Sequence, residues 1–144
     1  YKNGMLFSRR MWRQMVQPYQ QRAIDWAHAH GVKAHMHSCG NIMAVVPDLV
    51  AMGLDGLNPM EVKAGMDPLG IKRDHGSVLL LEGGLDSRAF DVYEQAVAEI
   101  DAKLPTLMAS GGYCFASDHS IPDSVSLDVY RRIIAYAKRA GRYG

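Results

Sequence analysis

The sequence predicts an α/β fold in which about four βα units form a parallel sheet. Short apolar runs that end in Gly, Asn, Asp or Pro alternate with longer stretches that carry charged faces, which is the alternation of strands and helices in such a sheet. The run SVLLLEGG is apolar almost throughout, as expected of a strand buried on both faces. Four such units fit either half of an eightfold βα barrel or a small open sheet.

Composition and charge indicate one globular domain and exclude some partners. The chain has 144 residues, of which 48% are hydrophobic and 22% are charged, so it can bury a core. Its formal net charge is only +1, and we therefore expect neither nucleic acid nor an anionic membrane as a partner. The sequence start has no apolar segment of the secretory type, so we expect a cytoplasmic protein whose two cysteines are reduced.

The first third of the chain predicts a helix, a strand and a second helix. Ser8 is a suitable N-cap for a helix that runs to about His30, where a Gly-Val pair supplies the stop. The strand at 33–37 follows this helix. Pro47 either begins or interrupts the next helix, which we place within 41–53.

The middle of the chain predicts two strands that flank a short helix. The strands are expected at 54–58 and 78–83. Asp67 is suited to cap the helix between them, because Pro68 then occupies the first helical position, where its missing N–H costs nothing.

The last third predicts a long helix, a fourth strand and a closing helix. The long helix should cover 86 to about 109, and Pro105 must end or bend it. The fourth strand is expected at 113–117, and the closing helix should run from Ser126 to Ala140. Because βαβ connections are right-handed, we expect four parallel strands, adjacent in chain order, with the helices on one side.

The stretch HMHSCGN raises the possibility of a metal site. Alternate side chains of a strand share a face, so His35 and His37 point the same way and Cys39 continues their row. Imidazole and thiolate together suit zinc. The structural alternative is a hydrogen-bonded core histidine beside a capping cysteine, which is the commoner meaning of an isolated His-x-Cys pair.

A catalytic zinc needs a third protein ligand from another strand. The candidates that follow other predicted strands are Cys114, Glu61, Asp118 and His119. Cys114 is the natural choice chemically, and strand alternation sets it on one face with Ala116 and Asp118. A small buried apolar residue is an equally good interpretation of Cys114, and a solvated loop charge is an equally good interpretation of Glu61.

Three other groups of polar residues need an interpretation, and only the first of them suggests chemistry. Asp118 and His119 end the fourth strand together and could act as an orienting group and a general acid or base. Asp86 is better explained as an N-cap than as a substrate contact. The arginines of the first helix are expected to form a solvated face; they are Arg9, Arg10 and Arg13.

Four segments spread over the whole chain resemble the uroporphyrinogen decarboxylase superfamily, and in particular its branch related to the cobamide-dependent methyltransferases. They are YKNGMLFSRRMW, HAHGVKAHMHSCGNI, GLDGLNPMEVKAGMD with LEGGLD, and GGYCFASDHSIPDSVS. The resemblance implies a TIM-type barrel more than twice as long as this chain. Residues 1–144 would then form the C-terminal half of a single barrel domain.

The resemblance also implies a site and a reaction. The methyltransferase branch binds zinc through a His-x-Cys pair and a distant cysteine, which match His37 and Cys39 and, with a one-residue offset, Cys114. The implied reaction is zinc-dependent transfer of a corrinoid-bound methyl group to a thiol, and the implied partners are a small-molecule acceptor and a corrinoid protein.

Two alternatives from other classes stay open. In a metal-free uroporphyrinogen decarboxylase, His119 and Asp118 would position a carboxylate or a proton. In the second alternative the chain is an inactive fragment or a partner-binding half barrel, and its unpaired strand edges would make it self-associate.

Overall fold

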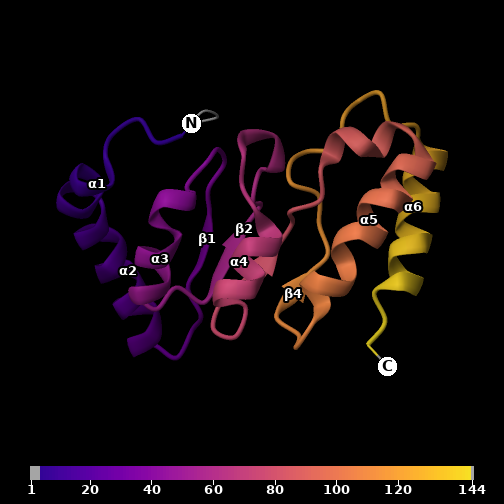
Figure 1. The fold of residues 1–144 in the computed structure, drawn as a ribbon. Coiled ribbons are helices and arrows are strands. Elements are labelled where there is room, and N and C mark those ends of the chain that lie inside the picture. Colours follow the sequence, from indigo (N-terminus) through magenta and orange to yellow (C-terminus); the bar gives the residue numbers. More distant parts are fainter. Residues whose placement is uncertain (1–3, 144) are drawn as a thin grey trace.

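The computed structural model describes residues 4–143 and has one four-stranded parallel sheet with the strand order β1-β2-β3-β4 (Figure 1). The strands are β1 (His35–His37), β2 (Gly56–Asn58), β3 (Leu80–Glu82) and β4 (Tyr113–Cys114). Each strand pairs in parallel with the next strand of the sequence. The prediction of four parallel strands, adjacent in chain order, is therefore confirmed, although each strand is shorter than the predicted range.

Helices precede the first strand and follow every strand. The α-helices are α1 (Arg9–Met15), α2 (Gln17–Ala29), α3 (Val46–Ala51), α4 (Pro68–His75), α5 (Tyr93–Met108) and α6 (Leu127–Ala140), and the 3-10 helices are η1 (Met43–Val45), η2 (Val62–Ala64) and η3 (Ser87–Asp91). The predicted caps Ser8, Asp67 and Asp86 are confirmed, because the side chain of each accepts a backbone N–H of the first helical turn, and Ser126 caps α6 in the same way. In residues 4–143, no helix has the length and apolar character needed to cross a bilayer.

The prediction of one helix from Ser8 to about His30 is wrong. The chain forms two helices that meet at Val16, and Pro18 lies in the first turn of α2. Proline has no N–H, and its ring collides with the carbonyl four residues earlier, so a single helix cannot pass through Pro18 undisturbed. Near the start of a new helix the same residue is tolerated, because that N–H has no helical partner.

The prediction of one helix over 86–109 is also wrong. Val92 has an extended backbone and separates η3 from α5. Pro105 does not end α5, which continues to Met108. Pro105 is exposed, so water can solvate the carbonyl that the proline leaves without its helical partner.

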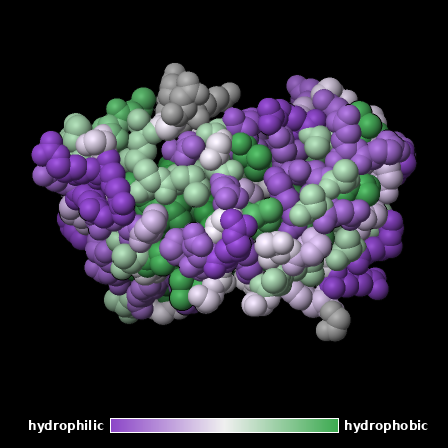
Figure 2. Space-filling model, viewed as in Figure 1, coloured by the Kyte–Doolittle hydropathy of each residue, from purple (hydrophilic) through white to green (hydrophobic). Residues whose placement is uncertain are grey.

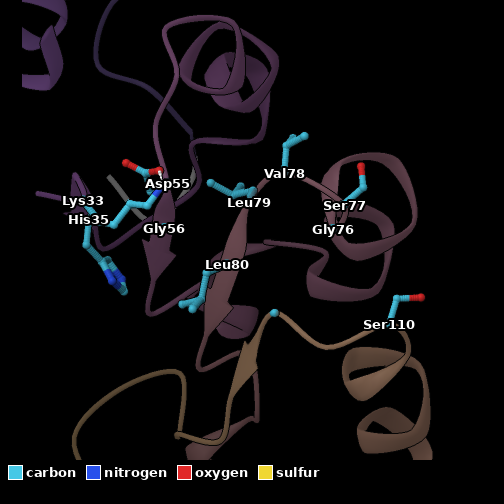
Figure 3. A pocket seen from close by; sticks show the side chains of 11 residues that line it. Lys33, His35, Asp55, Gly56, Gly76, Ser77, Val78, Leu79, Leu80 and Ser110 are labelled. Atoms are coloured by element: carbon cyan, nitrogen blue, oxygen red, sulfur yellow. Dashed lines mark hydrogen bonds and ion pairs between the residues drawn. The ribbon is translucent and has the colours of Figure 1, made fainter. Parts of the chain in front are cut away.

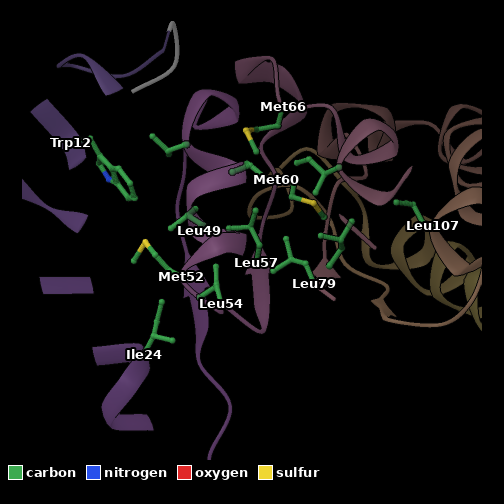
Figure 4. Close-up of a cluster of buried hydrophobic side chains, with 14 residues drawn as sticks. Trp12, Ile24, Leu49, Met52, Leu54, Leu57, Met60, Met66, Leu79 and Leu107 are labelled. Atoms are coloured by element: carbon green, nitrogen blue, oxygen red, sulfur yellow. The ribbon is translucent and has the colours of Figure 1, made fainter. Parts of the chain in front are cut away.

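Two apolar clusters pack the helices against one face of the sheet. The larger cluster joins α1 to α4 to the strands, and Figure 4 shows how Trp12 and Ile24 meet Leu49 and Met52 beside Leu57. The second cluster packs η3, α5 and α6 together with β4. Burial of these side chains is the main favourable free energy of the fold. The helical side of the molecule is covered largely by hydrophilic residues, with smaller apolar areas between them (Figure 2).

The opposite face of the sheet carries polar side chains. Strand register sets His37 opposite Asn58 and Glu82 opposite Cys114, so these four residues form one row across the sheet. His37 and Cys114 are exposed, whereas the neighbouring apolar row contains Leu57 and Leu81, which are 1% and 0% exposed. β1 and β4 lie at the two edges of this sheet, and self-association through them stays a prediction.

The expected arginine face of α1 is exposed, and two of its arginines also bind a buried carboxylate. Arg9 Nε donates to Asp48 Oδ2 at 2.5 Å, and Arg13 Nε donates to Asp48 Oδ1 at 2.9 Å. The Asp48 side chain is 8% exposed, so the two guanidinium groups replace the water it loses. This contact attaches α1 to α3.

We predict that Asp48 makes folding sensitive to acid. The hydrogen bond from Arg9 is the main reason that the pKa of Asp48 is lowered from its ordinary value of 3.8, although burial acts in the opposite direction. A lowered pKa in the folded state gives stability that is present above about pH 4 and is lost as the pH falls through the folded pKa. In urea titrations from pH 6 to pH 2, Asp48→Asn should show a smaller acid loss of unfolding free energy than the wild type. Asp74→Asn, which removes an exposed helical carboxylate, should match the wild type.

Candidate functional site

A cleft of about 310 Å³ lies at the carboxyl ends of the strands. Residues that end or follow each of the four strands line it; they are His37, Cys39, Asn58, Pro59, Glu82, Ala116, Ser117, His119 and Ser120. Active sites of βα barrels lie at this end of the sheet, because the loops after parallel strands converge there. The cleft is therefore the candidate functional site.

The His37 imidazole and the Cys39 thiol meet at the mouth of β1. His37 Nε2 and Cys39 Sγ are 3.3 Å apart, and both residues are exposed. Gly40 follows with a backbone φ of +78°, which suits glycine and turns the chain directly after the thiol. A nitrogen and a sulfur this close can bind the same ion, and they belong to the donor types that zinc prefers.

Glu61 holds the turn that contains Cys39. It is only 2% exposed, and its Oε2 accepts the Gly40 N–H at 2.7 Å. Lys63 Nζ lies 3.8 Å from the other carboxylate oxygen. Glu61 is thus neither a solvated loop charge nor part of the cleft lining. It is a buried carboxylate that connects the loop after β2 to the loop after β1.

Asp118 connects three of the loops at this end of the sheet. It is 0% exposed, Oδ2 accepts the Val62 N–H and Oδ1 accepts the Ser87 N–H, each at 2.9 Å. Both oxygens of Asp118 therefore bind backbone N–H groups of the loops after β2 and β3. His119 lies in the cleft lining and is exposed.

Cys114 lies outside the cleft lining. It is exposed and in register with Glu82, on the same row as His37 but three strands away. At about 4.8 Å per strand the two backbones are roughly 14 Å apart. Ala116, two residues further along, does line the cleft. Within residues 4–143, no group of three His, Cys, Asp or Glu side chains is close enough to hold a metal ion as the side chains stand.

Glu82 is the titratable residue of the cleft lining that the sequence analysis did not single out. Its side chain is 37% exposed, and its Oε2 lies 3.7 Å from His35 Nε2, which is beyond hydrogen-bond distance. The His35 ring lies over Gly56, where an added Cβ would come within 3.0 Å of Nδ1. An acidic residue as the last member of an apolar run is the signal that could have identified Glu82.

A second cavity of about 380 Å³ lies at the amino ends of the strands, beside Lys33, His35, Asp55 and Leu80 (Figure 3). The carboxylate of Asp55 in this cavity already has protein partners. It accepts hydrogen bonds from Lys33 Nζ and from the Ala34 N–H, and it lies 2.7 Å from His28 Nε2. The hydrogen bond from Lys33 is the main reason that the pKa of Asp55 is lowered well below its usual range. This end of a βα barrel serves stability rather than catalysis, so we assign the function to the other cleft.

The sheet has four parallel strands in chain order, and each strand is followed by a helix. This arrangement is consistent with part of an α/β barrel. The chain belongs to the uroporphyrinogen decarboxylase family, because the family model described as uroporphyrinogen decarboxylase (URO-D) matches residues 2–140. The expected family and the TIM-type fold are thereby confirmed. Comparisons with curated proteins and with solved structures gave no match.

Proposed function

We propose that this chain supplies the zinc-binding part of an enzyme that transfers a methyl group from a corrinoid to a thiol. The observation that carries the proposal is the 3.3 Å separation of His37 Nε2 and Cys39 Sγ in the cleft at the carboxyl ends of the strands. A bound zinc ion would act as a Lewis acid that lowers the pKa of the acceptor thiol and so yields the nucleophile.

The residues of the cleft suit this chemistry. His37 and Cys39 would hold the ion, and the bond from Glu61 to Gly40 would keep the Cys39 turn in place. His119 lines the same cleft and would accept the thiol proton if Glu82, rather than His119 itself, is the third ligand. Asp118 would act indirectly, because it holds the loops around the cleft. For the third ligand we rank Glu82 and His119 above Cys114, because Glu82 and His119 line the cleft and Cys114 does not.

Metal-free decarboxylation of a porphyrinogen receives less support from the residues at hand. Such a reaction needs no metal ligand, so it would leave the close approach of His37 and Cys39 in the cleft without a role. We therefore rank methyl transfer first.

We predict that zinc binding requires Cys39. The chain should bind about one zinc per molecule in equilibrium dialysis followed by plasma emission analysis. Cys39→Ser should weaken zinc binding at least about tenfold, since a hydroxyl is a poorer zinc ligand than a thiolate and even changes around a metal site cost this much.

Cys114→Ser is the matched control, because it makes the same chemical change at the other thiol. Retained zinc in Cys114→Ser would direct the search for the third ligand to Glu82 and His119, and lost zinc would assign that role to Cys114. Wild-type protein without zinc, or equal zinc in Cys39→Ser, would contradict the proposal.

A further inference from the structure

Two buried carboxylates join the turn that contains Cys39 to the loop after β4. Glu61 Oε2 accepts the Gly40 N–H at 2.7 Å, and the next residue along the chain, Val62, donates its N–H to Asp118 Oδ2 at 2.9 Å. Gly40 directly follows Cys39 in the sequence. The two hydrogen bonds and the backbone between them therefore form one continuous path through the loops after β1, β2 and β4.

We propose that Glu61 and Asp118 act together as one positioning unit, which fixes the Cys39 thiol and the His119 imidazole in a common frame. Asp118 directly precedes His119, so each end of the path lies next to a residue that lines the cleft. β1 and β4 are the two edges of the described sheet, and the strands alone leave Cys39 and His119 three strands apart. The part of this inference that concerns zinc rests on the proposed function, because it explains how a proposed ligand is held.

Burial makes this path firm. Glu61 is 2% exposed and Asp118 is 0% exposed, so water cannot take the place of either carboxylate. Breaking one of the bonds would leave a buried N–H without an acceptor, which is costly. Asp118 Oδ1 also accepts the Ser87 N–H at 2.9 Å, and this bond attaches the loop after β3 to the same unit.

The loops after β1 and β2 share two further contacts in which neither carboxylate takes part. Asn41 Nδ2 donates to the Gly65 carbonyl at 3.2 Å, and the Ile42 N–H donates to Met66 Sδ at 3.3 Å. These contacts should keep the two loops together when a carboxylate is replaced. The expected loss is therefore confined to the turn that contains Cys39.

Hydrogen exchange of the Gly40 amide tests the path without any metal. Its rate is divided by that of the Ile100 amide, which belongs to a fully buried residue of α5, so that a change of global stability cancels. Asp118→Asn should raise this normalised rate at least about threefold, although the bonds of Asp118 go to other amides. Asp123→Asn, which removes an exposed carboxylate nearby, is the control and should leave the rate unchanged. An unchanged rate in Asp118→Asn would overturn the inference.

Two variants of Glu61 separate its hydrogen bond from the bulk of its side chain. Glu61→Leu removes the acceptor of Gly40 and should raise the normalised exchange rate at least about tenfold. Glu61→Gln keeps one oxygen for Gly40, and its NH₂ can replace the buried Oε1, which has no hydrogen-bond partner among the described residues. It should therefore restore most of the protection. Circular dichroism checks the fold. An equal loss of protection in both variants would overturn the inference, even if Asp118→Asn does not fold.

Zinc affinity, measured by competition with a chromophoric chelator, tests the consequence for the proposed site. Glu61→Leu should weaken zinc binding about 10- to 100-fold, as the loss of groups around a metal site does, and Glu61→Gln should restore most of the affinity. In the Glu61→Leu background, Asp118→Asn should change the affinity by no more than about twofold, because the path is already broken.

The outcomes distinguish this inference from the proposed function. Zinc affinity that is unaltered in Glu61→Leu, or losses that add up in the double variant, would overturn the positioning unit and leave the zinc site standing. A chain that binds no zinc but shows the expected exchange rates at Gly40 would instead contradict the proposed function and keep the positioning of the turn that contains Cys39.

Discussion

Replacing Asp118 by Asn is expected to lower the free energy of unfolding by about 2–4 kcal/mol. The carboxylate is fully buried and accepts two backbone N–H groups, one from Val62 and one from Ser87. Asparagine keeps one acceptor oxygen but sets an NH₂ donor against the second N–H. One buried N–H therefore loses its partner, and the charge that strengthened both bonds is gone.

Urea unfolding followed by circular dichroism measures this loss. Asp123→Asn is the control, because Asp123 is an exposed loop residue only a few positions along the chain, and its replacement should change the unfolding free energy by no more than about 0.5 kcal/mol. Hydrogen exchange adds a local readout: the amides of Val62 and Ser87 should lose protection in Asp118→Asn. An unfolding free energy equal to that of the wild type would show that Asp118 does not hold these loops.

Gly83→Ala is expected to cost about 3–5 kcal/mol, a large part of the stability of a domain of this size. Gly83 has a φ of +101°, which is unfavourable for any residue with a side chain. An added Cβ would also fall inside contact distance of the Pro59 carbonyl oxygen, which is backbone and cannot turn away. Backbone strain and overpacking each contribute roughly 1–3 kcal/mol.

Gly111→Ala separates the two costs of Gly83→Ala. Gly111 has a φ of +74°, but an added Cβ would meet nothing within 4 Å. Its replacement should cost only about 1–2 kcal/mol, the backbone part alone. If both variants lost the same unfolding free energy, the close approach of β3 to Pro59 would not be a tight packing constraint. Because Pro59 lines the cleft, Gly83→Ala should also alter zinc binding if it remains folded.

Features that depend on neighbouring residues were predictable from the sequence. The order of strands and helices follows from the spacing of apolar residues, and the caps at Ser8, Asp67 and Ser126 follow from contacts within one helical turn. The close approach of His37 and Cys39 also follows from a spacing of two residues at a strand end. Alternation holds as far as Ala116, which lines the cleft, but it fails at Asp118, which is buried and accepts backbone N–H groups of two loops.

Only the tertiary structure decided which distant residues meet. Asp48 binds arginines more than thirty residues away, and Asp118 binds Val62 across 56 positions of the chain. Glu82 joins the row of His37 through the strand register, and the same register sets Cys114 three strands from His37. The physical reason is that the free energy of a carboxylate depends on the donors that folding brings to it. A local sequence pattern identifies the carboxylate but does not specify those donors.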